Sequence, residues 1–129
     1  MNTDGRIAER MKEARASLEE AKSLLEAGMD LGFVMNSLYY AVLYSVYALL
    51  ESKGIEIATQ SVSIARFDDE FIEKGVFDRG LSVTLHRAFE LRRSCACETP
   101  RDLSRRDAEA LLPGVETFLK AVEEHFAAK

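Results

Sequence analysis

Apolar residues along most of this chain recur at alternating steps of three and four, which is the spacing that places side chains on one face of an α-helix. The first such stripe predicts a helix over residues 4–27, with Gly28 as its C-cap. No segment alternates apolar and polar positions for long enough to predict a β-strand. The pattern therefore predicts an all-α protein.

The second predicted helix, capped by Asp30 and extending to about residue 52, is apolar around nearly its whole circumference. Residues 31–50 carry no charge, and a stretch of this length is also long enough to span a membrane. Asn36, Ser37 and the four tyrosines within it, together with the need of the other helices for a core, favour a buried helix instead. The short glycine-containing link before it predicts an antiparallel hairpin with the first helix.

Three further helices complete the predicted bundle. One covers residues 61–74, and the next is capped by Asp78. The last begins at Ser104, which forms a capping-box pattern with Asp107. Pro113 lies inside this last helix and is expected to kink it, because proline removes a backbone hydrogen bond and clashes with the preceding turn.

The length of 129 residues and the hydrophobic content of 47% fit a single domain over residues 1–129. We expect an up-and-down helical bundle of four long helices plus a short one. The net charge of -5 argues against a general nucleic-acid-binding surface. Residues 87–106, however, carry six arginines against three carboxylates, which gives +3 there and leaves -8 for the rest. This basic segment either meets a phosphate or an acidic partner, or is a solvated helix end and loop.

Candidate catalytic and metal-binding residues are sparse. His86 and His125 are the only histidines, and their spacing suggests no catalytic triad or dyad. The sequence contains no glycine-rich phosphate loop and no Glu-x-x-His pair of a di-iron bundle. Cys95 and Cys97 lack the further ligands of a structural zinc site. We therefore expect no metal and no cofactor, and the lack of a signal-peptide pattern predicts a cytoplasmic protein.

The tyrosines of the second helix form a second group of candidates. Tyr40, Tyr44 and Tyr47 stand on one helix face, and Tyr39 points to the side of that face. Such rings fill a core or an interface, with each hydroxyl needing a partner, and stacking on nucleic-acid bases is an alternative role.

Three runs of the sequence also point to a family: SLYYAVLYSVYALLESKGIE, TQSVSIARFDDEFIEKGVFD and LHRAFELRRSCACE. The Tyr-Tyr-Ala second helix that ends in Leu-Leu and a Lys-Gly turn, the Phe-rich third helix and the late Phe-x-Leu-Arg resemble the small stand-alone HEPN proteins of prokaryotes. The resemblance covers nearly the whole chain. It implies a helical bundle that forms a homodimer, often encoded beside a nucleotidyltransferase in a toxin–antitoxin-like pair.

Active proteins of that family are metal-independent ribonucleases with an Arg-x4-6-His motif near the dimer interface. Arg92 matches the arginine of that motif, but no histidine follows it within reach, and Gln60 stands where a histidine often opens the third helix. The resemblance therefore implies a non-catalytic homodimer that binds a nucleotidyltransferase-like partner chain, a nucleotide or RNA. We predict four residues that bind this ligand or partner: Tyr40, Arg87, Arg92 and Arg93.

The alternative is a metal-independent ribonuclease toxin. It would use Arg92, or the pair Arg79 and His86, which fits Arg-x6-His and shares one face of the fourth helix. This pair begins the fourth helix instead of ending it, so a chance spacing is the simpler interpretation.

Overall fold

The computed structural model describes the backbone of residues 3–96 and 104–128 and the side chains of residues 4–92 and 104–128. Within these ranges the chain contains helices and turns and no strand, which confirms the all-α prediction. The elements in chain order are α1 (Thr3–Glu26), α2 (Leu31–Ser52), α3 (Gln60–Phe67), the π-helical turn η1 (Asp68–Ile72), α4 (Arg79–Ala96) and α5 (Arg105–Ala127).

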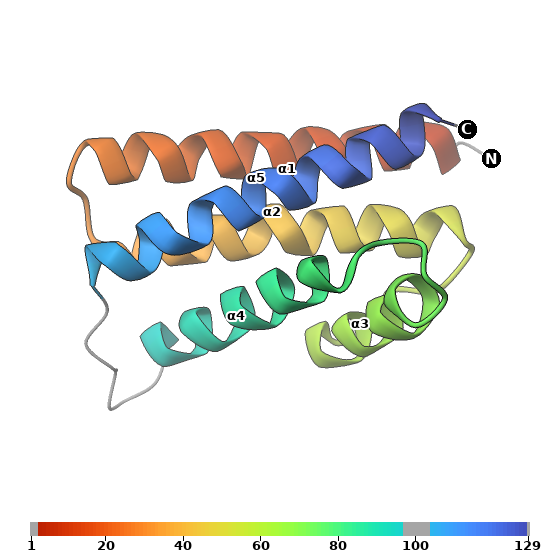
Figure 1. Ribbon diagram of the computed structural model, residues 1–129. Helices are drawn as coiled ribbons and strands as arrows, with labels where there is room; N and C mark the ends of the chain where they lie inside the picture. Colours follow the sequence, from red (N-terminus) through yellow and green to blue (C-terminus); the bar gives the residue numbers. More distant parts are fainter. Residues whose placement is uncertain (1–2, 97–103, 129) are drawn as a thin grey trace.

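The α1–α2 hairpin forms as predicted, and the two helices run antiparallel side by side (Figure 1). Gly28 has a φ of 69°, the left-handed conformation that ends a helix and suits glycine. The carboxylate of Asp30 accepts a hydrogen bond from the Gly32 amide, so the N-cap of α2 is confirmed as well. The guanidinium of Arg105, at the start of α5, donates to the carbonyl oxygen of Leu25 at 2.9 Å and ties α5 to this end of the hairpin.

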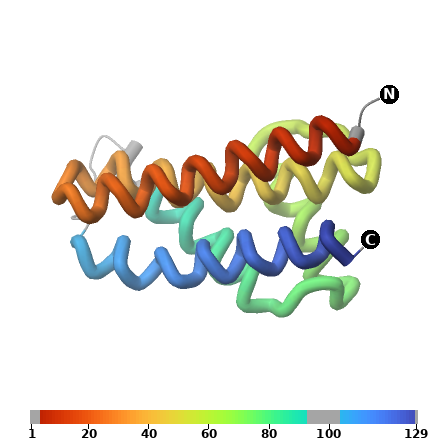
Figure 2. The backbone as a smooth tube through the Cα atoms, turned by 90° about the horizontal axis from the view of Figure 1, so that it is seen from above, coloured from red at the N-terminus to blue at the C-terminus, as the bar shows by residue number. Residues whose placement is uncertain are grey.

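The helix α2 is the centre of the bundle, because α1, α3, α4 and α5 all pack against it. Viewed from above, α1 and α5 lie along its length on neighbouring sides (Figure 2). It is the one described helix long and apolar enough to cross a membrane, and 72% of its most apolar window is buried inside the bundle. This burial is typical of a core helix, as the sequence predicted.

The third predicted helix differs from the structure. Instead of one helix over residues 61–74, α3 ends at Phe67 and continues into η1, where the amide of Glu73 donates to the carbonyl of Asp68, five residues earlier, at 2.9 Å. The wider turn keeps Phe71 and Ile72 buried while the Asp68 carboxylate faces α4. These contacts with the rest of the bundle offset the poorer geometry of a π-turn.

The two last helices are capped as predicted. The carboxylate of Asp78 accepts from the Gly80 amide at 2.9 Å, and Ser104 and Asp107 form the reciprocal bonds of a capping box. Pro113 does not end α5, which continues from Arg105 to Ala127. The helices α4 and α5 approach closely at Gly114, where an added Cβ would lie 2.7 Å from Oγ1 of Thr84.

Candidate anion-binding site around Arg92

The residue predicted to bind an anion, Arg92, lies on α4 beside the middle of α2. Its guanidinium carbon is 5.4 Å from the centre of the Tyr39 ring, which is a cation–π distance. Among the described residues, no carboxylate forms an ion pair with Arg92, in contrast to Arg10, Arg15 and Arg105. Arg92 is therefore a partly exposed cation that is positioned by an aromatic ring and keeps its hydrogen-bond donors for another group.

Tyr39 supports this arginine from inside the bundle. It was expected to point to the side of the tyrosine face, and the structure buries it fully. Its hydroxyl donates to Oε1 of Gln60 at 2.7 Å, so the first residue of α3 is joined to the core of α2. Burial raises the pKa of Tyr39 to about 12, and the charge of Arg92 opposes only part of this effect. The hydroxyl therefore stays protonated, and donates its hydrogen bond, throughout the physiological pH range.

Beyond Tyr39, three half-buried tyrosines follow one face of α2. The ring of Tyr40 lies 5.4 Å from that of Tyr39 and 5.6 Å from that of Tyr44, and Tyr47 follows at 6.5 Å. Arg10 of α1 covers the Tyr47 ring at 5.2 Å. Burial also raises the pKa of Tyr44 and Tyr47. The predicted face of Tyr40, Tyr44 and Tyr47 therefore exists, and we call these three residues the tyrosine stripe.

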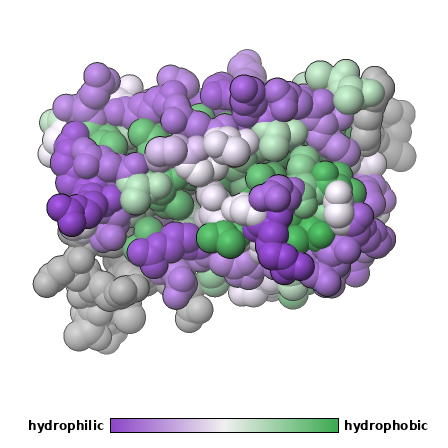
Figure 3. Space-filling view, viewed as in Figure 1, coloured by the Kyte–Doolittle hydropathy of each residue, from purple (hydrophilic) through white to green (hydrophobic). Residues whose placement is uncertain are grey.

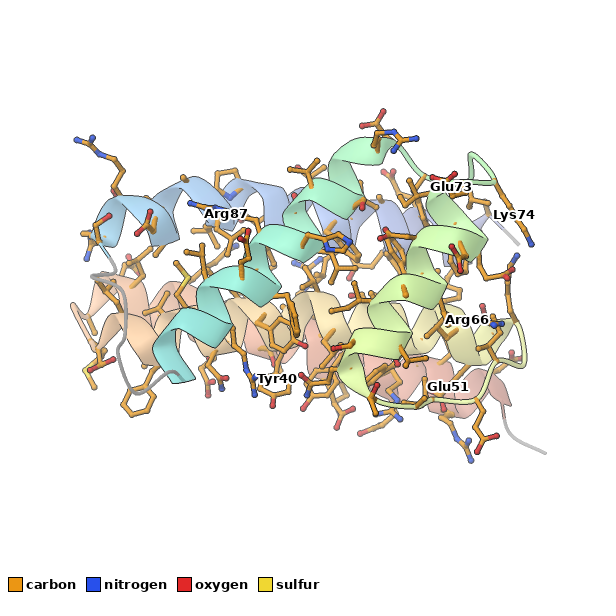
Figure 4. All side chains as sticks on the ribbon, turned by 90° about the horizontal axis from the view of Figure 1, so that it is seen from below. Tyr40, Glu51, Arg66, Glu73, Lys74 and Arg87 are labelled. Atoms are coloured by element: carbon orange, nitrogen blue, oxygen red, sulfur yellow. The ribbon has the colours of Figure 1, made fainter. Side chains whose placement is uncertain are left out.

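Arg87 lies apart from Arg92 on the other side of α4. Figure 4 shows Arg87 on the side of α4 that faces α5 and Tyr40 on the opposite side of that helix. The Arg87 guanidinium is about half exposed and reaches Asp107 only at 4.0 Å. It borders a shallow groove of ≈ 300 Å³ between α4 and α5, beside the exposed side chain of Val83. On this face, hydrophilic residues surround smaller apolar patches (Figure 3). Arg87 and Arg92 therefore do not form one cluster.

The two residues of the alternative pair, Arg79 and His86, each contact a different carboxylate. Nε2 of His86 contacts Asp68 of η1 at 2.6 Å, and the same carboxylate accepts from the Ser82 hydroxyl at 2.7 Å. Arg79 lies nearest to Glu73, at 3.7 Å. The structure thus gives His86 a partner in η1 and Arg79 a different one.

The other histidine lies in an aromatic cluster. The centre of the His125 ring lies 6.2 Å from that of Phe71, 5.3 Å from that of Phe77 and 5.6 Å from that of Phe126. His86 of α4 therefore pairs with Asp68 of η1, and His125 lies among aromatic rings near the end of α5.

Some predicted residues fall outside the described part. The backbone of Arg93 belongs to α4, but its side chain and that of Cys95 lie outside the described residues, as does Cys97. Among the described side chains, no group of three or more His, Cys, Asp or Glu residues could hold a metal ion.

Sequence reasoning missed Asp68 as a contact residue. Its two partners, Ser82 and His86, are four residues apart and share one face of α4, but nothing in the local sequence links them to residue 68. Gln60 was noted only as a departure from the HEPN pattern, and the structure gives it a role as the acceptor for Tyr39.

Comparisons with known proteins agree with this architecture. The model of the HEPN domain family matches residues 7–125. A "UPF0332 protein" of Thermotoga maritima is 31% identical over 125 residues, which cover 96% of this chain and 94% of that protein. The protein named "Putative toxin MJ0142" of Methanocaldococcus jannaschii is 27% identical over 124 residues, with 92% and 84% of the two chains covered.

Proposed function

Because this chain belongs to the HEPN family, we propose that it is a non-catalytic HEPN-type homodimer that binds a phosphate-bearing or acidic group through Arg92. The ligand would be a nucleotide, RNA or a nucleotidyltransferase-like partner chain. One observation carries the proposal: the Arg92 guanidinium rests on the buried Tyr39 ring without a carboxylate partner among the described residues. A cation held in this way recognises phosphate or carboxylate through its planar set of donors.

The surroundings of Arg92 support binding over catalysis. Cleavage of RNA at this arginine needs a group that titrates near neutral pH to take the proton of the 2'-hydroxyl. His86 and His125 are engaged elsewhere in the protomer. The nearby Tyr39 hydroxyl has a pKa of about 12, so it cannot act as the base at neutral pH.

The remaining predicted residues have secondary roles in this proposal. Tyr40 lies against Tyr39 and would offer its half-exposed ring to an apolar side chain of a partner chain or of the second protomer. Arg87 and Arg93 would contribute long-range attraction for an anion. The name of the Methanocaldococcus relative, a putative toxin, supports a place in a toxin–antitoxin-like pair. We propose that this pair acts in the cytoplasm.

The test is a titration of the purified protein with ATP and with single-stranded RNA, followed by the shift in melting temperature and by calorimetry. Ligand binding to the folded state raises the melting temperature. We expect Arg92→Ala to weaken binding by at least about tenfold, because one charge-assisted contact is lost. Arg66→Ala is the matched control, since Arg66 is a half-exposed arginine of α3 with only a 4.0 Å contact to Glu70.

The proposal predicts two further results in the same series. Incubation of the wild type with total RNA should give no cleavage. Purification of the tagged protein from its native host should recover a nucleotidyltransferase-like chain with the wild type and less of it with Arg92→Ala. Equal affinities of the Arg92→Ala and Arg66→Ala variants for every ligand, with equal recovery of the partner, would contradict the proposal.

The second candidate is the metal-independent ribonuclease toxin, which the name of the Methanocaldococcus relative favours. RNA cleavage by the wild type that disappears in Arg92→Ala or in His86→Ala would establish this function and assign the residue. Cleavage that survives both substitutions would point to a contaminating nuclease.

A further inference from the structure

A groove of ≈ 570 Å³ lies at the end of the bundle where the first turns of α1, the end of α2 and the last turns of α5 meet. Its volume is in the range of ligand-binding sites. Both ends of the chain are drawn at this end of the molecule in Figure 1. The groove shares no lining residue with the surroundings of Arg92 or with the tyrosine stripe.

The groove has an apolar floor, by which we mean its four apolar lining residues. Three of them, Ile7, Ala8 and Met11, belong to α1, and the fourth, Phe126, belongs to α5. Arg10, which covers Tyr47, is not among the lining residues of the groove, and neither are Tyr40, Tyr44 and Tyr47. The groove and the tyrosine stripe are therefore lined by different residues.

The polar lining of the groove consists of hydrogen-bond acceptors. Asp4 and Glu123 contribute carboxylates, and no lysine or arginine among the described residues lines the groove. Arg15 neutralises part of the Glu123 charge from outside, with contacts of 2.6 and 3.3 Å. The Ser52 hydroxyl donates to the Leu49 carbonyl at 2.6 Å, which leaves its oxygen as an acceptor.

We propose that this groove binds a basic amphipathic segment of a partner chain. Leucine-like side chains one helical turn apart would occupy the apolar floor, and lysine or arginine side chains would pair with Asp4 and Glu123. The charge of the lining selects this occupant, since an acidic segment would meet like charges at close range. The inference is independent of the function proposed for Arg92, because the two sites share no residue.

The probe is a fluorescent synthetic peptide of leucine and lysine in the three-four helical repeat. Its counterpart carries glutamate in place of every lysine. We expect anisotropy titrations to show the lysine peptide binding at least about tenfold more tightly than the glutamate peptide. The double variant Asp4→Asn, Glu123→Gln should remove most of this preference.

A matched pair of alanines tests the location. Ala8 is an exposed lining residue, and Ala16 is an exposed residue of the same helix outside the groove. Ala8→Phe should fill the apolar floor and lower the affinity for the lysine peptide about tenfold. Ala16→Phe should leave that affinity unchanged. If Ala8→Phe does not fold, as judged by circular dichroism, the double charge variant decides the test.

Three results would overturn the proposal. Equal affinity for both peptides would show that charge does not select the occupant. Equal effects of Ala8→Phe and Ala16→Phe would place binding elsewhere. A change of oligomeric state in Ala8→Phe but not in Ala16→Phe, measured by sedimentation velocity, would make the groove a contact between copies of this chain.

Discussion

Tyr39 links three parts of the molecule through one side chain. Its ring supports Arg92, its hydroxyl bonds to Gln60, and the whole side chain is buried at the centre of the bundle. The neutral form of the phenol is required for this arrangement, because a buried phenolate would lose its hydration.

The raised pKa of Tyr39 predicts a pH dependence of stability. The folded value is about 12 and the reference value is 10.0, so the folded state holds the proton more tightly. The corresponding stabilisation is complete below pH 10 and is lost as the pH rises from 10 to 12, by about 2–3 kcal/mol. Urea unfolding across this range should show that loss in the wild type and a smaller one in Tyr39→Phe. Parallel pH profiles of the two proteins would contradict the assignment to Tyr39.

The sequence was enough to single out Arg92 as a candidate, but it did not show that Tyr39 is buried. The resemblance to HEPN proteins depends on a Phe-x-Leu-Arg sequence that can be read directly. In contrast, α2 is apolar around nearly its whole circumference, so its pattern does not show which of two adjacent tyrosines faces α3 and α4.

Among the elements, the α4–α5 contact depends most clearly on a single small residue. Gly114 faces Thr84, and an added Cβ would lie 2.7 Å from its Oγ1 and 3.3 Å from its Cγ2. The threonine is part of α4, so relief of the clash requires a new rotamer or a shift of one helix against the other.

We predict that Gly114→Ala destabilises the protein by about 1–3 kcal/mol, although alanine is the better helix former. Thr84→Ala removes both of the closest atoms, so the double variant should recover most of that loss. Thermal and urea unfolding of the two single variants and the double variant give the coupling between the positions. A stabilising effect of Gly114→Ala alone would show that the helices adjust without cost.

The helix ends were predictable because their signals are local, as at Asp30 and at Ser104 with Asp107. The π-turn η1 was not, because its stabilising contacts come from Ser82 and His86, at least fourteen residues further along the chain. A helical stripe of three-four spacing cannot show that one turn has been widened.

On the scale of the whole molecule, the tyrosine stripe is the surface on which we expect the second protomer. The stripe extends toward the exposed ring of Phe33 on the same helix, and its described neighbours Arg10 and Glu51 already form an ion pair at 2.9 Å. An aromatic surface whose charges pair with each other suits a self-complementary contact better than a nucleic acid.

Tyr44→Glu should therefore convert a dimer into a monomer, because it places a charge at the centre of the expected contact. Val62→Glu is the control, since Val62 is an exposed apolar residue of α3 outside the stripe. Sedimentation velocity at micromolar concentration measures the result. A monomeric wild type, or a Tyr44→Glu variant that remains dimeric, would exclude this contact.

The hydrogen bond from Arg105 to the Leu25 carbonyl has a consequence for the order of folding. The last turn of α1 receives this donor from a residue 80 positions later, on the far side of the connection between α4 and α5. Because this donor belongs to α5, we expect the amides of that turn to exchange more slowly once α5 has docked. Slow amide exchange near Leu25 would therefore indicate that the whole bundle has formed, although Leu25 itself belongs to the α1–α2 hairpin.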